Sequence, residues 1–130
     1  MSDDEHPNAA LVRRLFAAFG TDPMAVSAAL ARDVVWRVPG HTIMSGEYRG
    51  RRAVVEFLRR TGLETGGTYR SLLHTVLADD EWAVAIYRAT GSRNGIDLDV
   101  DQALVIRIAD GLLQDVTAVP LASAFQRFWA

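Results

Sequence analysis

The sequence predicts an α+β fold, in which three N-terminal helices cover one face of a curved antiparallel sheet. Apolar residues recur at helical spacing early in the chain, whereas the segments after Tyr69 read as strands separated by turns. A fifth short strand, residues 34–38, lies among the helices. A strongly curved sheet covered on one side leaves a concave space, which side chains fill or which remains open as a pocket.

Three helices are expected before the sheet. Asn8 can cap the first, and Gly20 is the glycine that ends it. Asp22 followed by Pro23 is the pair expected at the start of the second. Apolar residues at helical spacing mark the third helix. The predicted helices span residues 9–20, 23–31 and 51–60.

Turn residues separate the predicted strands. Pro39-Gly40 breaks the first strand, and residues 46–50 form a second turn region. Asn-Gly within residues 91–95 predicts a hairpin, and Asp110-Gly111 predicts the next tight turn. Residues 122–130 can form a last helical turn. The predicted strands are residues 34–38, 69–78, 82–90, 96–109 and 112–119.

Composition restricts the possible partners. The 130 residues show no repeat and no second domain, so we expect a single domain over residues 1–130, with residues 1–7 as a flexible tail. The chain has no cysteine, which excludes disulfides and thiolate metal sites. A net charge of −2 with scattered basic residues argues against nucleic acid. The longest apolar run is far below a membrane span, and the acidic start is unlike a signal peptide. We therefore expect a cytoplasmic protein with no nucleic-acid or membrane partner.

One row of the strand 96–109 is apolar except for Gln102, so this row is expected to face the interior. A buried amide needs hydrogen-bond partners. Gln102 therefore binds either a polar group of a ligand or a neighbouring side chain or loop. Leu104 follows Gln102 in the same row.

The opposite row of that strand contains three alternate aspartates, Asp97, Asp99 and Asp101. No histidine accompanies them, so a solvated face is favoured over a metal site, and no metal is expected. Ala103 and Val105 continue the row and are less polar than a monomer's outer face normally is. We therefore expect a homodimer through the outer face of the sheet.

Three side chains could transfer a proton in a pocket. His41 follows the break at Pro39-Gly40, and histidine titrates near neutral pH. His74 lies on a predicted strand, where strand parity does not decide which face it occupies. Asp115 shares a predicted row with Leu113; if that row is internal, burial raises the pKa of Asp115, and otherwise Asp115 is a surface charge.

Aromatic side chains are the candidates for substrate contact. Trp36 lies in an apolar row of the first strand and forms either a pocket wall or a plug. Tyr48 lies in the irregular segment after that strand, and Phe57 lies in the third helix. Tyr87 shares its row with small alanines that leave room for a ligand or a partner subunit.

The segments "DVVWRVPGHTIMSGEYRGRRAVVEFL", "HTVLADDEWAVAIYRATGSRNG" and "VIRIADGLL", with a terminal "FW", are similar to the SnoaL-like branch of the nuclear transport factor two-like superfamily. The resemblance covers nearly the whole chain. It implies a cone-shaped α+β fold around a deep apolar pocket. Members include ketosteroid isomerases, polyketide cyclases, limonene-epoxide-hydrolase-like enzymes and non-catalytic binders, so the fold alone does not decide the function.

The family's catalytic groups transfer poorly to this chain. The isomerases have an aspartate on the strand before the loop, where this chain has Arg37 and Val38, and their second aspartate falls near Leu104. The Asp-Arg-Asp set of the epoxide hydrolases is not evident, since Asp99 and Arg107 lie in the outer row. The cyclases need a single acid or base in an apolar pocket. The three candidates above could meet that demand.

The resemblance therefore implies a pocket for a small hydrophobic, oxygenated molecule. The preferred hypothesis is a cofactor-independent cyclase or isomerase of secondary metabolism that uses general acid/base catalysis. The alternatives are a non-catalytic binding protein with the same pocket and a protein-interaction module of the same fold.

Overall fold

The computed structural model describes residues 5–130 and confirms the α+β class. Helices and strands follow one another in the order expected, with one strand added where a turn was predicted. The elements are α1 (Pro7–Ala18), α2 (Pro23–Ala28), β1 (Leu30–Val38), β2 (Gly46–Arg49), α3 (Arg51–Glu64), β3 (Arg70–Ala78), β4 (Trp82–Arg93), β5 (Ile96–Ala109), β6 (Leu112–Pro120) and α4 (Ala124–Phe128).

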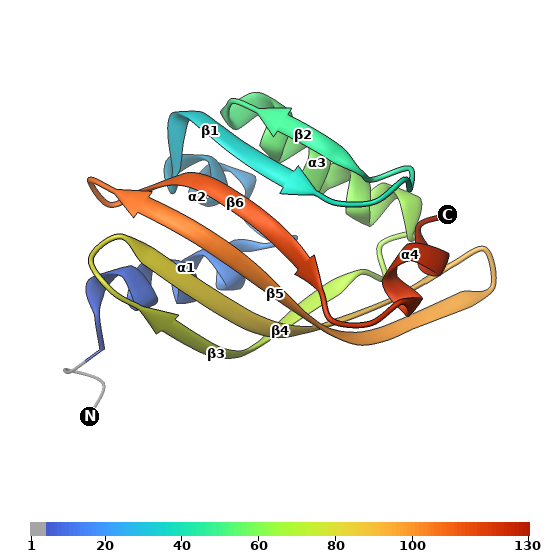
Figure 1. The fold of residues 1–130 in the computed structure, drawn as a ribbon. Helices are drawn as coiled ribbons and strands as arrows, with labels where there is room; N and C mark the ends of the chain where they lie inside the picture. Colours follow the sequence, from blue (N-terminus) through green and yellow to red (C-terminus); the bar gives the residue numbers. More distant parts are fainter. Residues whose placement is uncertain (1–4) are drawn as a thin grey trace.

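All strands belong to one six-stranded sheet with the order β2-β1-β6-β5-β4-β3. Neighbouring strands are antiparallel except β1 and β6, which run parallel. β6 is the last strand of the meander and lies beside the early strand β1 (Figure 1). β2 occupies part of the predicted turn region at residues 46–50, where Tyr48 pairs with Trp36 of β1.

The helix ends differ from the prediction in ways that side-chain caps explain. α1 begins at Pro7 because the imidazole of His6 accepts a hydrogen bond from the Asn8 backbone N–H, at 3.0 Å. Residues 6 and 7 of the predicted tail thus belong to this helix start, and residues 1–4 lie outside the described part. The side chain of Asp22 caps α2 as predicted, by accepting from the Ala25 N–H. α3 continues to Glu64, four residues beyond the predicted end.

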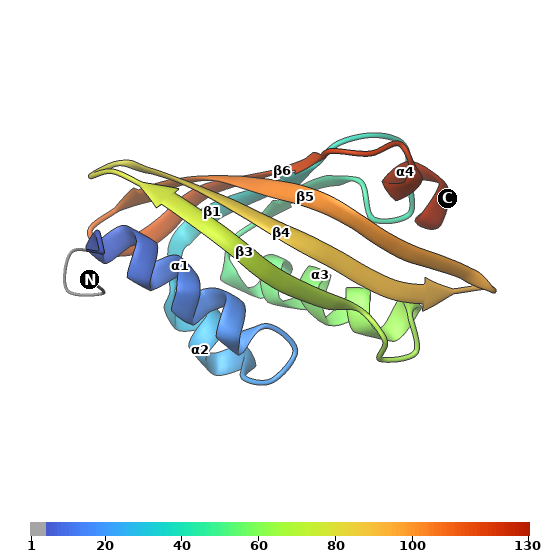
Figure 2. The ribbon, with the colours of Figure 1, turned by 90° about the horizontal axis from the view of Figure 1, so that it is seen from below.

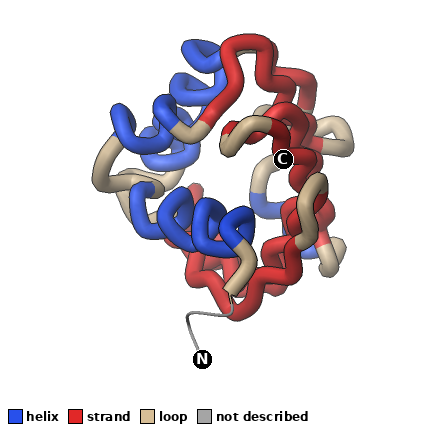
Figure 3. The backbone as a smooth tube through the Cα atoms, turned by 90° about the vertical axis from the view of Figure 1, so that its left-hand side faces the viewer, coloured by secondary structure: helices blue, strands red, loops and turns tan. Residues whose placement is uncertain are grey.

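Helices α1, α2 and α3 cover one face of the sheet, and the opposite face carries no helix layer (Figure 2). Seen from its end, the curved sheet and the helices surround the interior of the fold (Figure 3). The inner row of β5 is buried from Leu98 to Ile108, as its pattern predicted, whereas Ile96 at the hairpin end is half exposed. On β4 the small inner residues are Ala83, Ala85 and Ala89. No helix in residues 5–130 is long and apolar enough to cross a membrane.

Two β-bulges change which side chains face inward. In β3 the register shifts at His74, so that Leu73 packs against the interior and His74 is half exposed. In β6 the register shifts near Gln114, so that Leu113 and Val116 are both fully buried. An extra residue in one strand reverses the inward and outward alternation beyond it. The predicted row that joined Leu113 to Asp115 is therefore wrong.

Candidate functional site

A cavity of about 540 Å³ lies between the helices and the concave face of the sheet. Its walls come from the end of α1, from α2, from one side of α3, from the start of β3, from the inner rows of β1, β4, β5 and β6, and from the C-terminal α4. A volume of this size is typical of small-molecule sites, which are mostly apolar with few polar groups.

Aromatic rings form one wall of this cavity. Trp36 of β1 lies between Phe19 and Phe57, with ring centroids 6.4 and 6.1 Å away. Tyr48 stacks on the ring of Phe57 at 4.3 Å, and its hydroxyl donates to the Met44 carbonyl. Trp36 is buried but borders open space, so it is a wall of the cavity rather than a plug.

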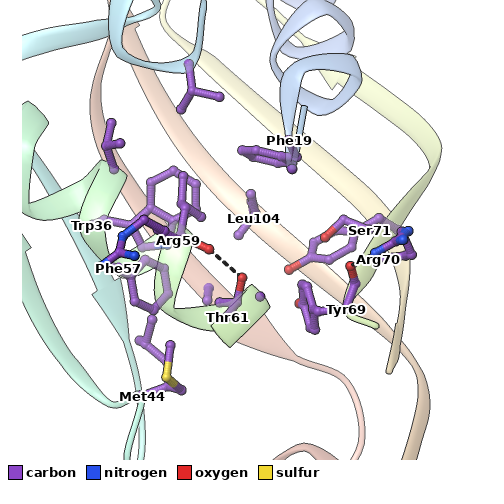
Figure 4. A pocket seen from close by; sticks show the side chains of 18 of the residues that line it. Phe19, Trp36, Met44, Phe57, Arg59, Thr61, Tyr69, Arg70, Ser71 and Leu104 are labelled. Atoms are coloured by element: carbon purple, nitrogen blue, oxygen red, sulfur yellow. Dashed lines mark hydrogen bonds between the residues drawn. The ribbon is translucent and has the colours of Figure 1, made fainter. Parts of the chain in front are cut away.

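The opposite wall carries polar side chains. Figure 4 shows Tyr69 and Ser71 across the cavity from Trp36 and Phe57, with Leu104 projecting from the sheet between them. Beside them the Gln102 amide Nε2–H donates to the Tyr87 hydroxyl at 3.0 Å, and both side chains are at most 5% exposed. The cavity thus has an aromatic side and a hydroxyl-and-amide side.

Tyr69 reaches this position through the segment that joins α3 to β3. The Tyr69 backbone N–H donates to the Thr65 hydroxyl, which itself donates to the Thr61 carbonyl in the last turn of α3. Gly91 of β4 lies so close to Tyr69 that an added Cβ would be 3.3 Å from the Tyr69 Cα. A side chain at position 91 would therefore be tight against the Tyr69 backbone, which would have to shift by a few tenths of an ångström.

Both tyrosines are protonated at neutral pH, because the ordinary tyrosine pKa of about 10 lies well above it and the protein environment raises both values further. Desolvation raises the pKa of Tyr87 well above its usual value, and the neighbouring Tyr69 adds to the shift. Desolvation also raises the pKa of Tyr69, against the opposing effect of Ser71, Tyr87 and Gln102 beside its hydroxyl. At neutral pH both hydroxyls are therefore hydrogen-bond donors and acceptors rather than phenolates.

The segment after β1 places Met44, not His41, in the cavity. The Ser45 hydroxyl donates to the Pro39 carbonyl and accepts from the Thr42 N–H, which folds the segment into a compact turn. Met44 is 1% exposed and lines the cavity, whereas His41 is exposed and does not.

The other two predicted acid/base residues also lie outside the cavity. His74 is 3.7 Å from Asp101 on the outer face of the sheet. Asp115 is hydrogen-bonded by Arg37 and, at 3.1 Å, by Arg107 on the same outer face. The Arg37 hydrogen bond lowers the pKa of Asp115, the reverse of the rise expected for a buried carboxylate.

The structure thus brings together part of the predicted set. The predicted residues that line the cavity are Trp36, Phe57, Tyr87, Gln102 and Leu104, while Tyr48 lies behind Phe57. Within residues 5–130, no histidine and no carboxylate side chain lines the cavity. Tyr69 was not predicted; its signal is that it shares strand parity with Ser71 and Leu73, the row that turned out to face inward.

The model of the SnoaL-like domain matches residues 12–116, which is most of the chain. The chain belongs to the SnoaL-like domain family. The uncharacterized protein Rv0034 of Mycobacterium tuberculosis is 36% identical to it over 135 residues, across the full length of both chains.

Solved structures agree with this SnoaL-like assignment. Bal32a from a soil-derived mobile gene cassette superposes with a TM-score of 0.90 at 33% identity, covering 95% of this chain and 97% of Bal32a. TerC, co-crystallised with polyporic acid, superposes with a TM-score of 0.82 at 20% identity, covering 95% of this chain and 98% of TerC. The SnoaL-like cone fold predicted from the sequence is confirmed.

Proposed function

We propose that this SnoaL-like protein takes up a small hydrophobic, oxygenated molecule in the cavity. The observation that carries the proposal is the division of the cavity into an aromatic wall and a polar wall. Trp36 and Phe57 offer flat apolar contact to the body of a ligand, while Tyr69, Tyr87 and Gln102 offer hydrogen bonds to an oxygen at its end. TerC, which shares the fold, was co-crystallised with polyporic acid.

The binding proposal is tested by filling the cavity. Ala118 lies in the cavity wall, so Ala118→Phe should occupy the space that a ligand needs. The neighbouring residue Val119 is 36% exposed on the opposite face, so Val119→Phe is a matched control on the same strand. The probe is N-phenyl-1-naphthylamine, whose fluorescence rises in an apolar site.

The wild type and Val119→Phe should bind the probe saturably with one site per chain, and Ala118→Phe should bind at least about tenfold more weakly. Thermal unfolding establishes that all three proteins are folded. Equal binding by the three proteins, or no saturable binding by the wild type, would contradict uptake into this cavity.

The second candidate is the cyclase or isomerase activity expected of such a fold, and the convergence of two protonated tyrosines favours it. Hydroxyl donors placed at a substrate carbonyl stabilise the negative charge that forms during enolisation. His41, His74 and Asp115 lie outside the cavity and would not contact a molecule bound there. The chain's own contribution to such a reaction would therefore be the stabilisation of the enolate oxygen by Tyr69 and Tyr87, while water or hydroxide from the solvent takes up the α-proton.

Exchange of the α-protons of 2-tetralone in D₂O, followed by NMR, separates the two candidates. An enzyme should accelerate exchange over buffer, lose about 10²- to 10³-fold of that rate in Tyr87→Phe, and keep it in His41→Ala, His74→Ala and Asp115→Asn. A binding protein should leave exchange at the buffer rate while the probe still binds. Loss of exchange in His41→Ala alone would instead assign the chemistry to the loop.

A further inference from the structure

The Gln102 side chain is buried with half of its hydrogen-bonding capacity unused. It is 2% exposed, and its Nε2–H donates to the Tyr87 hydroxyl at 3.0 Å. Its Oε1 is fully buried and has no hydrogen-bond partner within residues 5–130. Both Gln102 and Tyr87 line the cavity. The unpartnered amide oxygen thus belongs to a side chain of the polar wall, and protein atoms cover the oxygen itself in the ligand-free chain.

A buried acceptor without a donor is costly, and such groups are rare in folded proteins. Gln102 stands in an otherwise apolar row, between Val100 and Leu104, where an apolar side chain would satisfy packing without that cost. The amide is therefore explained by a donor that arrives with the ligand.

The hydrogen bond from Gln102 also determines which hydrogen bonds the Tyr87 hydroxyl can still make. Because its oxygen accepts the Gln102 N–H, the Tyr87 hydroxyl still has its own proton to donate. Tyr69 and Ser71 add two further hydroxyls on the same wall. The wall therefore holds one unused acceptor, Gln102 Oε1, next to hydroxyl donors, and a ligand can reach this oxygen once the amide turns toward the cavity.

We infer that the ligand carries a hydroxyl group at its inner end, as a phenol, an enol or an alcohol on a hydrophobic skeleton does. That hydroxyl donates to Gln102 Oε1 and accepts from a tyrosine hydroxyl, so a single group satisfies both. A plain ketone, an ether or a hydrocarbon leaves the amide oxygen unpartnered. This inference rests on the proposed function, because it specifies the class of molecule that the same cavity takes up.

A pair of probes that differ in one hydrogen-bond donor tests the inference. 2-Naphthol carries a hydroxyl, and 2-methoxynaphthalene has the same rings and oxygen but no donor. Hydrophobicity alone favours the methoxy compound, so a preference for 2-naphthol reports the hydrogen bond. Calorimetric titration of the wild type should show 2-naphthol binding at least about tenfold more tightly.

Variants assign the preference to the amide. Gln102→Met keeps the length of the side chain and removes both polar atoms, so its preference should fall to about onefold, and Gln102→Leu should do the same. Ile106→Val is the control, since Ile106 lies in the same buried row but does not line the cavity; it should keep the wild-type preference.

The outcomes separate the two proposals. If the wild type binds both probes equally, the hydroxyl inference is wrong while cavity binding stands. A preference that survives in Gln102→Met would also overturn the inference. If neither probe binds to the wild type, then cavity binding of such molecules fails as well.

Discussion

At the scale of single residues, the site is decided by a few polar atoms in an apolar interior. Gln102 could be predicted because it interrupts a regular apolar row, and such a residue needs a partner. Tyr69 was missed, although it shares strand parity with Ser71 and Leu73, because the sequence did not show which row of that strand faces inward. His41 was predicted to line the pocket because it follows Pro39-Gly40, which ends the first strand. The turn around Ser45 directs Met44 inward instead.

Gln102→Met should change the stability of the free protein little. In the absence of ligand it removes a buried acceptor that has no partner, which is stabilising, and it also removes the Nε2–H donor to the Tyr87 hydroxyl, which is destabilising. The two effects oppose each other, so the free energy of unfolding should change by no more than about 1 kcal/mol. Urea denaturation measures this change. Ile106→Val, which removes one buried methyl from the same row, should lower stability by about 0.5–1.5 kcal/mol.

A loss above about 2 kcal/mol in Gln102→Met is more than the lost hydrogen bond to Tyr87 accounts for, and it would mean that Oε1 is also satisfied within the protein. The hydroxyl requirement would then lose its main support.

At the scale of elements, the outer face of β1, β6 and β5 is held by an ion-pair cluster. Asp115 of β6 accepts from Arg37 of β1 and Arg107 of β5, and thus connects the parallel strand pair to the meander. Its carboxylate is 28% exposed and both guanidinium groups are more exposed, so solvent screening limits the stabilisation to about 1 kcal/mol.

The stability that Asp115 supplies should depend on pH. Its folded-state pKa lies below the unfolded-state value of about 3.9, so the contribution is present above that value and is lost as the pH falls through the folded pKa. Asp115→Asn should therefore cost about 1 kcal/mol at pH 7 and progressively less below about pH 4.

Urea denaturation across this pH range measures the effect. Asp33→Asn is the control, because Asp33 is exposed on β1 and forms no ion pair within the described residues. A cost for Asp115→Asn that stayed constant down to the lowest pH would refute the assigned ion pairs.

Element boundaries were predictable where local chemistry sets them. Asp22 and Pro23 begin α2, and Asn-Gly at 94–95 turns the hairpin with Asn94 at a positive φ of 52°. The bulges in β3 and β6 could not be predicted, because they arise from cross-strand register and leave no mark in the local pattern. They place His74 and Asp115 outside the cavity, which parity alone could not establish.

At the scale of the whole molecule, one face of the sheet lacks a helix layer. Its middle is apolar, with Val84 facing Val105 and Ile86 facing Ala103 across the β4–β5 ladder, and Leu77 is 65% exposed beside them. We propose that two copies of the chain pack these faces together as a homodimer, since isolated domains seldom expose a continuous apolar patch of this kind.

A charged substitution in the apolar centre of this face tests the dimer proposal. Val84→Lys should convert the protein from a dimer to a monomer in light scattering after size-exclusion chromatography, because two lysines would meet in the apolar centre. Leu63→Lys, on an exposed position of α3, should leave the mass unchanged. A monomeric wild type at all concentrations would exclude the proposed dimer.

The central claim is that the space between helices and sheet receives a small hydroxylated molecule. A crystal structure of the protein soaked with 2-naphthol tests it most directly. The rings should lie against Trp36 and Phe57, with the hydroxyl within hydrogen-bond distance of Gln102 Oε1. A cavity closed by its own side chains, or a probe bound only at the outer surface, would contradict the account.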